Sequence, residues 1–171
     1  YPLVDIDTRI AEVKNIRYPM AGMASHEVSL GVYNPATAET VFMNTRDEPE
    51  QYLCSVSWGP EENYIYIALL NRGQDHLKLN KYDAHSGELI KTLFEEKDKE
   101  YVEPEHPLFF SEKMPDRFIW YSERDGFMHL YLYTTEGELI RDLTPGKQTV
   151  HDILGIDKKG KSLYYMATPE N

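Results

Sequence analysis

The sequence predicts an all-β protein, and three observations support this fold class. Short apolar runs alternate with period two, as in Tyr64–Leu70 and Met128–Tyr133, which is typical of strands. No long window keeps the 3.6-residue apolar period of a helix. The chain also contains 13 Tyr, 6 Phe and 2 Trp, and such broad side chains pack well on a pleated surface.

An internal repeat narrows the fold class to one architecture. The segment Gly87–Leu93 (GELIKTL) recurs as Gly137–Leu143 (GELIRDL), and His76–Leu79 resembles His129–Leu132. The repeat interval is about 50 residues, and it contains four short strands, which is the pattern of a β-propeller blade. The sequence therefore predicts a partial β-propeller.

Turn residues set the expected blade boundaries. Clusters of Gly, Pro, Asn and Asp separate the strands, and Asp125-Gly126 is a strong hairpin signal. We expect two complete four-stranded blades, over residues 51–96 and 106–144. A half blade is expected on each side of them, over 18–45 and over 149–168. Residues 1–17 are expected to form an irregular connection. These pieces do not close a ring, so we expect open sheet edges, which offer a route to a homodimer, and a longer parent chain.

Charge and composition exclude several function classes. Lys and Arg total 18 against 29 Asp and Glu, a net charge of −11, which argues against binding to nucleic acid or to an anionic membrane surface. No apolar run approaches the roughly 20 residues that span a bilayer. The single cysteine, Cys54, cannot form an internal disulfide.

Four motifs carry a resemblance to a known family. They are Arg17–Gly22 (RYPMAG), Leu70–Gln74 (LNRGQ), Tyr101–Pro104 (YVEP) and Ser122–Tyr133 (SERDGFMHLYLY). In this order and at these spacings, they resemble the propeller domain of the dipeptidyl peptidase IV family, of the bacterial type found in Bacteroides-like organisms. The resemblance covers nearly the whole chain.

The resemblance implies an eight-bladed propeller joined, in the same chain, to an α/β-hydrolase domain. Together they would release dipeptides, with Pro or Ala second, from the amino termini of peptide substrates. The family's Ser–Asp–His triad is expected beyond the end of this chain, and its amine-binding Glu–Glu pair before Tyr1. The family also implies a periplasmic, secreted or cell-envelope location. No Gly-x-Ser-x-Gly nucleophile elbow occurs here, so we expect this piece to be inactive alone.

The candidate site lies on one face of the expected propeller. In an up-and-down blade, the loop between strands two and three emerges on the same face as the link to the next blade. In the resembled family this face looks toward the active-site cavity, although a solvated linker is the plainer interpretation. The substrate-facing candidates are Arg72, Tyr101, Glu103, Glu105, His106 and Arg124.

Other tempting motifs have structural interpretations. The pairs Glu61-Glu62 and Glu95-Glu96 are expected to be solvated, in a turn and at a strand end. Residues 155–162 match the phosphate-loop pattern Gly-x-x-x-x-Gly-Lys-Ser, but a strand follows where the chemistry needs a helix. We therefore expect a hairpin there and no nucleotide.

No metal site or cofactor is expected either. His76 and His129 occupy equivalent repeat positions, which favours a recurring structural hydrogen bond over metal ligation. The alternative to a peptidase segment is a non-catalytic protein-binding propeller, such as a receptor or scaffold.

Overall fold

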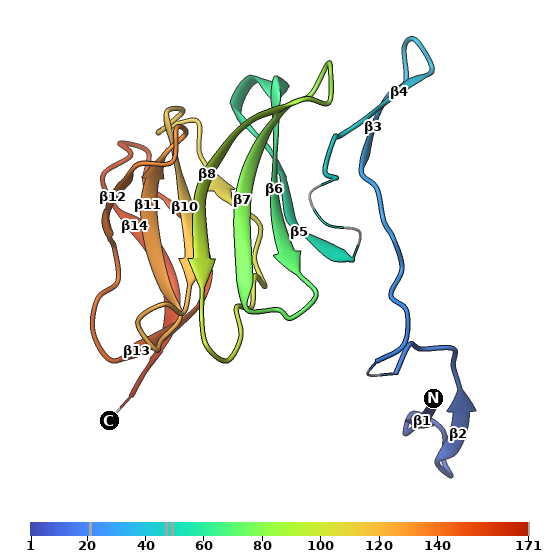
Figure 1. The fold of residues 1–171 in the computed structure, drawn as a ribbon. Coiled ribbons are helices and arrows are strands. Elements are labelled where there is room, and N and C mark those ends of the chain that lie inside the picture. Colours follow the sequence, from blue (N-terminus) through green and yellow to red (C-terminus); the bar gives the residue numbers. More distant parts are fainter. Residues whose placement is uncertain (21, 47, 49, 171) are drawn as a thin grey trace.

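The computed structural model describes residues 1–20, 22–46, 48 and 50–170 (Figure 1). These residues form antiparallel strands in two four-stranded and three two-stranded sheets, which confirms the all-β fold class. The helical turn in the described residues is a short 3₁₀ segment, Pro60–Glu62. Among them, no helix has the length and apolar character needed to cross a bilayer.

Each span that was expected to hold a whole blade contains one four-stranded sheet, with its strands in chain order. The first sheet consists of β5 (Gln51–Trp58), β6 (Tyr64–Asn71), β7 (His76–Asp83) and β8 (Leu89–Lys97). The second consists of β9 (Phe109–Phe110), β10 (Arg117–Ser122), β11 (His129–Thr134) and β12 (Leu139–Asp142). Two-stranded sheets flank them: β3 (Gly31–Asn34) with β4 (Glu39–Phe42), and β13 (Gln148–Ile156) with β14 (Leu163–Pro169).

The first 17 residues differ from the irregular connection that the sequence predicts. They contain a hairpin, β1 (Pro2–Asp5) with β2 (Glu12–Asn15), in which Val4 lies opposite Val13. This hairpin lies apart from the other sheets, at the end of an extended segment (Figure 1). β-Branched residues favour strand pairing, but a strand of four residues is too short to show a clear alternation in sequence.

The sheets stack face to face because strand β6 is apolar on both faces. Ile65, Ile67 and Leu69 pack with Met43 toward β3–β4, whereas Tyr66, Ala68 and Leu70 pack with Phe118 and Trp120 of the second sheet. Successive side chains of a strand point to opposite faces. An uninterrupted apolar run is therefore what a strand between two neighbouring sheets requires.

The second sheet repeats this arrangement. Ile119, Leu130 and Leu132 pack toward β13–β14, where Val150 is buried against them. The order of the stack thus follows the chain, from β3–β4 through both four-stranded sheets to β13–β14. Consecutive sheets packed in this way are the arrangement of blades in a β-propeller.

Two repeat-equivalent glycines allow close contact between neighbouring sheets. Gly87 and Gly137 have φ of 77° and 87°, which non-glycine residues rarely adopt. A Cβ added at Gly87 would lie 2.2 Å from the Phe42 carbonyl oxygen, and one at Gly137 would lie 2.5 Å from that of Leu93. The repeated Gly-Glu-Leu-Ile motif therefore places each turn against the backbone of the preceding sheet.

The loops of the stack divide between two ends. One end, here called the link end, carries the 72–75 loop, the link over residues 98–108 and the 123–128 loop (Figure 1). The link is fastened to the 72–75 loop, because Asp98 N donates to Asp75 O at 3.0 Å and Val102 N donates to Gln74 O at 2.7 Å. The turns over 59–63, 84–88, 135–138 and 157–162 lie at the opposite end.

Candidate functional site

A pocket of about 230 Å³ lies at the link end, between the link and the second four-stranded sheet. The link supplies the side chains of Tyr101, Val102 and Glu103, and β8 supplies Glu95 and Glu96. The end of β10 and the loop after it complete the lining with residues 120–124. The pocket is therefore built from both four-stranded sheets and the segment that joins them.

Glu96 connects the two sheets across this pocket. Its Oε1 accepts hydrogen bonds from Trp120 Nε1 at 2.7 Å and Arg124 Nη2 at 2.5 Å, and its Oε2 accepts from Ser122 Oγ at 3.0 Å. Only 11% of the side chain is exposed. Hydrogen bonds to an ionised carboxylate are short and strong, so Glu96 is a principal polar contact between the sheets.

Sequence reasoning missed this role, because Glu95-Glu96 was interpreted as a solvated strand end. That interpretation is wrong for Glu96. Phe94, two residues earlier, packs on Trp120 of the second sheet with ring centroids 5.7 Å apart. Residues two apart lie on the same face of a strand. A large apolar residue at position 94 therefore indicates that Glu96 also faces the neighbouring sheet and not solvent.

Arg124, a predicted substrate-facing residue, belongs to the same network. Its Nη1 donates to Tyr133 Oη at 2.7 Å, and its Cζ lies 4.2 Å from the ring centroid of Tyr131, within cation–π range. Partial burial of Arg124 lowers its pKa, but the interactions with Glu96 and Tyr133 are stronger, so the pKa of Arg124 is raised overall. The guanidinium is a fixed cation in the pocket wall, with 28% of its side chain exposed.

Glu103 and Glu123 line the pocket, and Glu105 of the link is close enough for its charge to act on Glu123; these three carboxylates are here called the rim. Burial raises the pKa of Glu123, and the negative charges of Glu103 and Glu105 on the link raise it further. Like charges held together disfavour ionisation. A positive group placed among them would relieve that repulsion, so the rim is suited to bind a cation.

The remaining predicted residues do not converge on the pocket. His106 stacks on the ring of Tyr121, with centroids 4.0 Å apart. Arg72 donates to Tyr52 Oη at 2.5 Å, beside β5. The structure thus brings together Tyr101, Glu103 and Arg124, whereas Arg72 lies elsewhere on the link end. Whether any of them contacts substrate stays a prediction.

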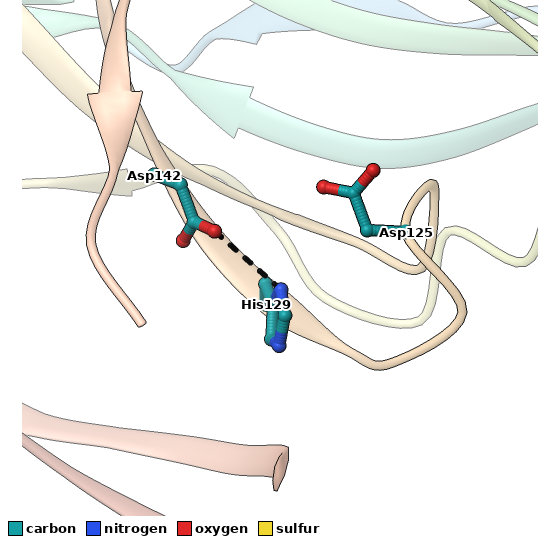
Figure 2. A group of neighbouring side chains, drawn as sticks. All are labelled: Asp125, His129 and Asp142. Carbon is teal, nitrogen blue, oxygen red and sulfur yellow. Dashed lines mark ion pairs between the residues drawn. The ribbon is translucent and has the colours of Figure 1, made fainter. Parts of the chain in front are cut away.

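A second cluster, formed by Asp125, His129 and Asp142, also lies at the link end (Figure 2). His129 Nε2 lies 2.9 Å from Gly146 O, and its Nδ1 lies 3.6 Å from Asp142 Oδ2. The equivalent His76 instead contacts Glu95 Oε2 at 2.7 Å. The expected recurring hydrogen bond is therefore wrong, because the two rings are held by different partners.

The other motifs are placed as expected. Glu61 and Glu62 are exposed in the turn between β5 and β6. Residues 157–162 form the turn of the β13–β14 hairpin, in which Asp157 Oδ1 accepts from Lys161 N at 2.6 Å and Ser162 N at 2.9 Å. The phosphate-loop pattern thus occurs in a hairpin, as predicted.

Comparison with known proteins agrees with the sheet stack. A crystal structure of a protein from Bacteroides ovatus, assigned as a dipeptidyl aminopeptidase IV, matches 98% of this chain with a TM-score of 0.85 and 40% identity, and 26% of that protein is covered. The structure of Porphyromonas gingivalis dipeptidyl peptidase 4 matches 98% with a TM-score of 0.78 and 27% identity, covering 24% of it.

Curated sequences give the same result. The venom dipeptidyl peptidase 4 of Vespa velutina is 30% identical over 95% of this chain and 22% of its own length. The chain thus spans about a fifth of the curated relatives it matches. Residues 1–171 match the family described as the dipeptidyl peptidase IV N-terminal region. The chain is a member of the dipeptidyl peptidase IV N-terminal region family.

Proposed function

We propose that this chain is the propeller segment of a serine exopeptidase that removes Xaa-Pro and Xaa-Ala dipeptides from peptide amino termini. The observation that carries the proposal is the match of 98% of the chain, at 40% identity, to a protein assigned as a dipeptidyl aminopeptidase IV. The segment walls the substrate chamber and limits access to it. The reacting groups come from an α/β-hydrolase domain of the same chain.

The charge of the link end supports this role. Glu103, Glu105 and Glu123 form a negative rim, and the amino terminus of a peptide carries a positive charge. A carboxylate attracts an ammonium group through charge-assisted hydrogen bonds. The rim would therefore draw the correct end of a peptide toward the chamber, with similar effect on the ground state and the transition state.

The cellular location is a separate proposal, based on the resemblance alone. We propose that the enzyme works in the periplasm, at the cell envelope or outside the cell, where peptides from degraded proteins are available. Open sheet edges would also allow two copies to pair.

The test compares the full-length protein with the isolated 171-residue chain on chromogenic Xaa-Pro and Xaa-Ala dipeptides. We expect release of the chromophore by the full-length protein and none by the isolated chain. The matched control is the full-length protein with its nucleophilic serine replaced. Absence of activity in the full-length protein, together with tight binding of an intact protein partner, would favour a non-catalytic propeller instead.

A further inference from the structure

The hydrogen bonding of His129 defines which ring nitrogen carries the proton. Nε2 lies 2.9 Å from the carbonyl oxygen of Gly146. A carbonyl oxygen only accepts hydrogen bonds, so Nε2 is the protonated nitrogen. In the neutral ring, Nδ1 therefore presents a lone pair.

That lone pair points into a buried space without a hydrogen-bond donor. In the described part of the chain, His129 Nδ1 is buried and has no hydrogen-bond partner, and only 4% of the side chain is exposed. An unpaired buried polar atom costs free energy that native proteins normally avoid. A group that binds the Nδ1 lone pair, such as a hydrogen-bond donor or a cation, would remove this cost.

The groups that face Nδ1 are acceptors as well. Asp142 Oδ2 lies 3.6 Å from it, and Asp125 belongs to the same group of potential ligands. A residue outside the cluster also positions each carboxylate. Thr144 N donates to Asp142 Oδ1 at 2.8 Å, and Tyr131 Oη donates to Asp125 Oδ2 at 2.5 Å. One potential ligand atom from each of the three residues lies within 4.8 Å of the other two, and Figure 2 shows Asp142 facing His129, with Asp125 on the neighbouring loop. A shared cation would stabilise such a group.

We propose that Asp125, His129 and Asp142 bind a divalent transition-metal ion, with Zn²⁺ the best match to this donor set. Two ligands at zinc distances of 2.0–2.1 Å in tetrahedral geometry lie about 3.3 Å apart, close to the observed 3.6 Å. The contact from Nε2–H to a backbone carbonyl is the outer-shell arrangement that orients metal-binding histidines. Three protein ligands leave the fourth position for water.

A proton on Nδ1 is the competing cation. It would make His129 an imidazolium that donates to Asp142. The 3.6 Å separation exceeds the roughly 2.7–3.2 Å of an N–H···O hydrogen bond. The geometry thus favours a larger cation between the two atoms, and the experiment separates the two cases.

The bound ion would connect the loop after β10 to the end of β12, at the link end of the second sheet. Asp125 belongs to the loop between β10 and β11, whereas Asp142 ends β12. Asp125 also follows Arg124 directly in the chain, and it accepts the hydrogen bond of Tyr131, over whose ring Arg124 lies. Metal binding would therefore stabilise the loop that presents Arg124 to the pocket.

The test uses the full-length protein, stripped of metal with a chelator and titrated with ZnCl₂ by calorimetry. We expect one tight equivalent that Asp125→Asn and Asp142→Asn each remove. Changes in the outer-shell partners of a metal site weaken metal binding about 10- to 100-fold. Loss of a direct ligand should weaken Zn²⁺ binding by more than that. The matched control is His76→Gln, at the equivalent repeat position, which should leave the tight equivalent in place.

Two further readouts guard against misfolding and adventitious binding. Both asparagine variants keep the side-chain size, and circular dichroism should show an unchanged fold. Zn²⁺ should raise the thermal midpoint of the wild type and of His76→Gln, but not that of Asp142→Asn. The proposal is overturned if the wild type takes up no tight equivalent, or if the tight equivalent survives in both asparagine variants.

Discussion

Replacing Glu96 by alanine removes the carboxylate that joins the two four-stranded sheets. Three hydrogen bonds to it are lost, each worth about 1.5–3 kcal/mol because the acceptor is charged. The full sum is not expected, because the freed Arg124 side chain is 28% exposed and water can solvate it. Breaking a more deeply buried pair costs about 3–5 kcal/mol, so we expect a loss of about 2–3 kcal/mol.

Hydrogen exchange measured by mass spectrometry on the full-length protein can detect this loss locally. Amides of β8 and β10 should exchange about 30- to 150-fold faster in Glu96→Ala, since each 1.4 kcal/mol is a factor of ten. The control is Glu95→Ala, which removes the adjacent, more exposed carboxylate and should have a much smaller effect. Equal acceleration by the two variants, or none by Glu96→Ala, would refute the inter-sheet role of Glu96.

Three other outcomes are expected. Gly137→Ala should destabilise the second sheet by about 2 kcal/mol or more, and thermal denaturation should show a smaller effect for Gly126→Ala, whose Cβ would meet nothing within 4 Å. Glu103→Ala should raise KM about 2- to 5-fold on cationic peptides with kcat unchanged, whereas alanine at positions 61 and 62 should alter neither. Because the pKa of Glu123 is raised, its ionisation destabilises the folded state. Urea unfolding should therefore show Glu123→Gln more stable than wild type above the raised pKa, with the difference vanishing in acid.

The sheet stack was largely predictable from sequence, because its signals are local. Strand alternation and turn residues depend on neighbouring residues, and the repeat of Gly87 at Gly137 can be read directly by comparing two stretches of the sequence. The run 64–70 was recognised as a strand, and the structure shows that both of its faces are buried. The β1–β2 hairpin was missed because its strands are too short to show periodicity.

The polar contacts of the link end were less predictable. Glu96 lies in β8 of the first four-stranded sheet and Arg124 in the loop after β10 of the second, so they meet only when the two sheets stack. Asp142 faces His129 because the register places it opposite Tyr131, and no sequence pattern specifies that register. The sequence pattern places the candidate residues at the link end, and their role with substrate stays a prediction. It does not show which of these side chains are held by other residues, as Arg124 is by Glu96 and Tyr133.

The close approach at Gly87 and Gly137 has an evolutionary consequence. Each of these turns rests against the backbone of the preceding sheet, so an inserted residue would collide with it or separate the two blades. The link over residues 98–108 is held to the 72–75 loop by two backbone hydrogen bonds, and its outer side is largely exposed. Insertions and deletions among homologues should therefore accumulate in the link and avoid the glycine turns. Sequence change would then alter the link end while the spacing between neighbouring sheets stays constant.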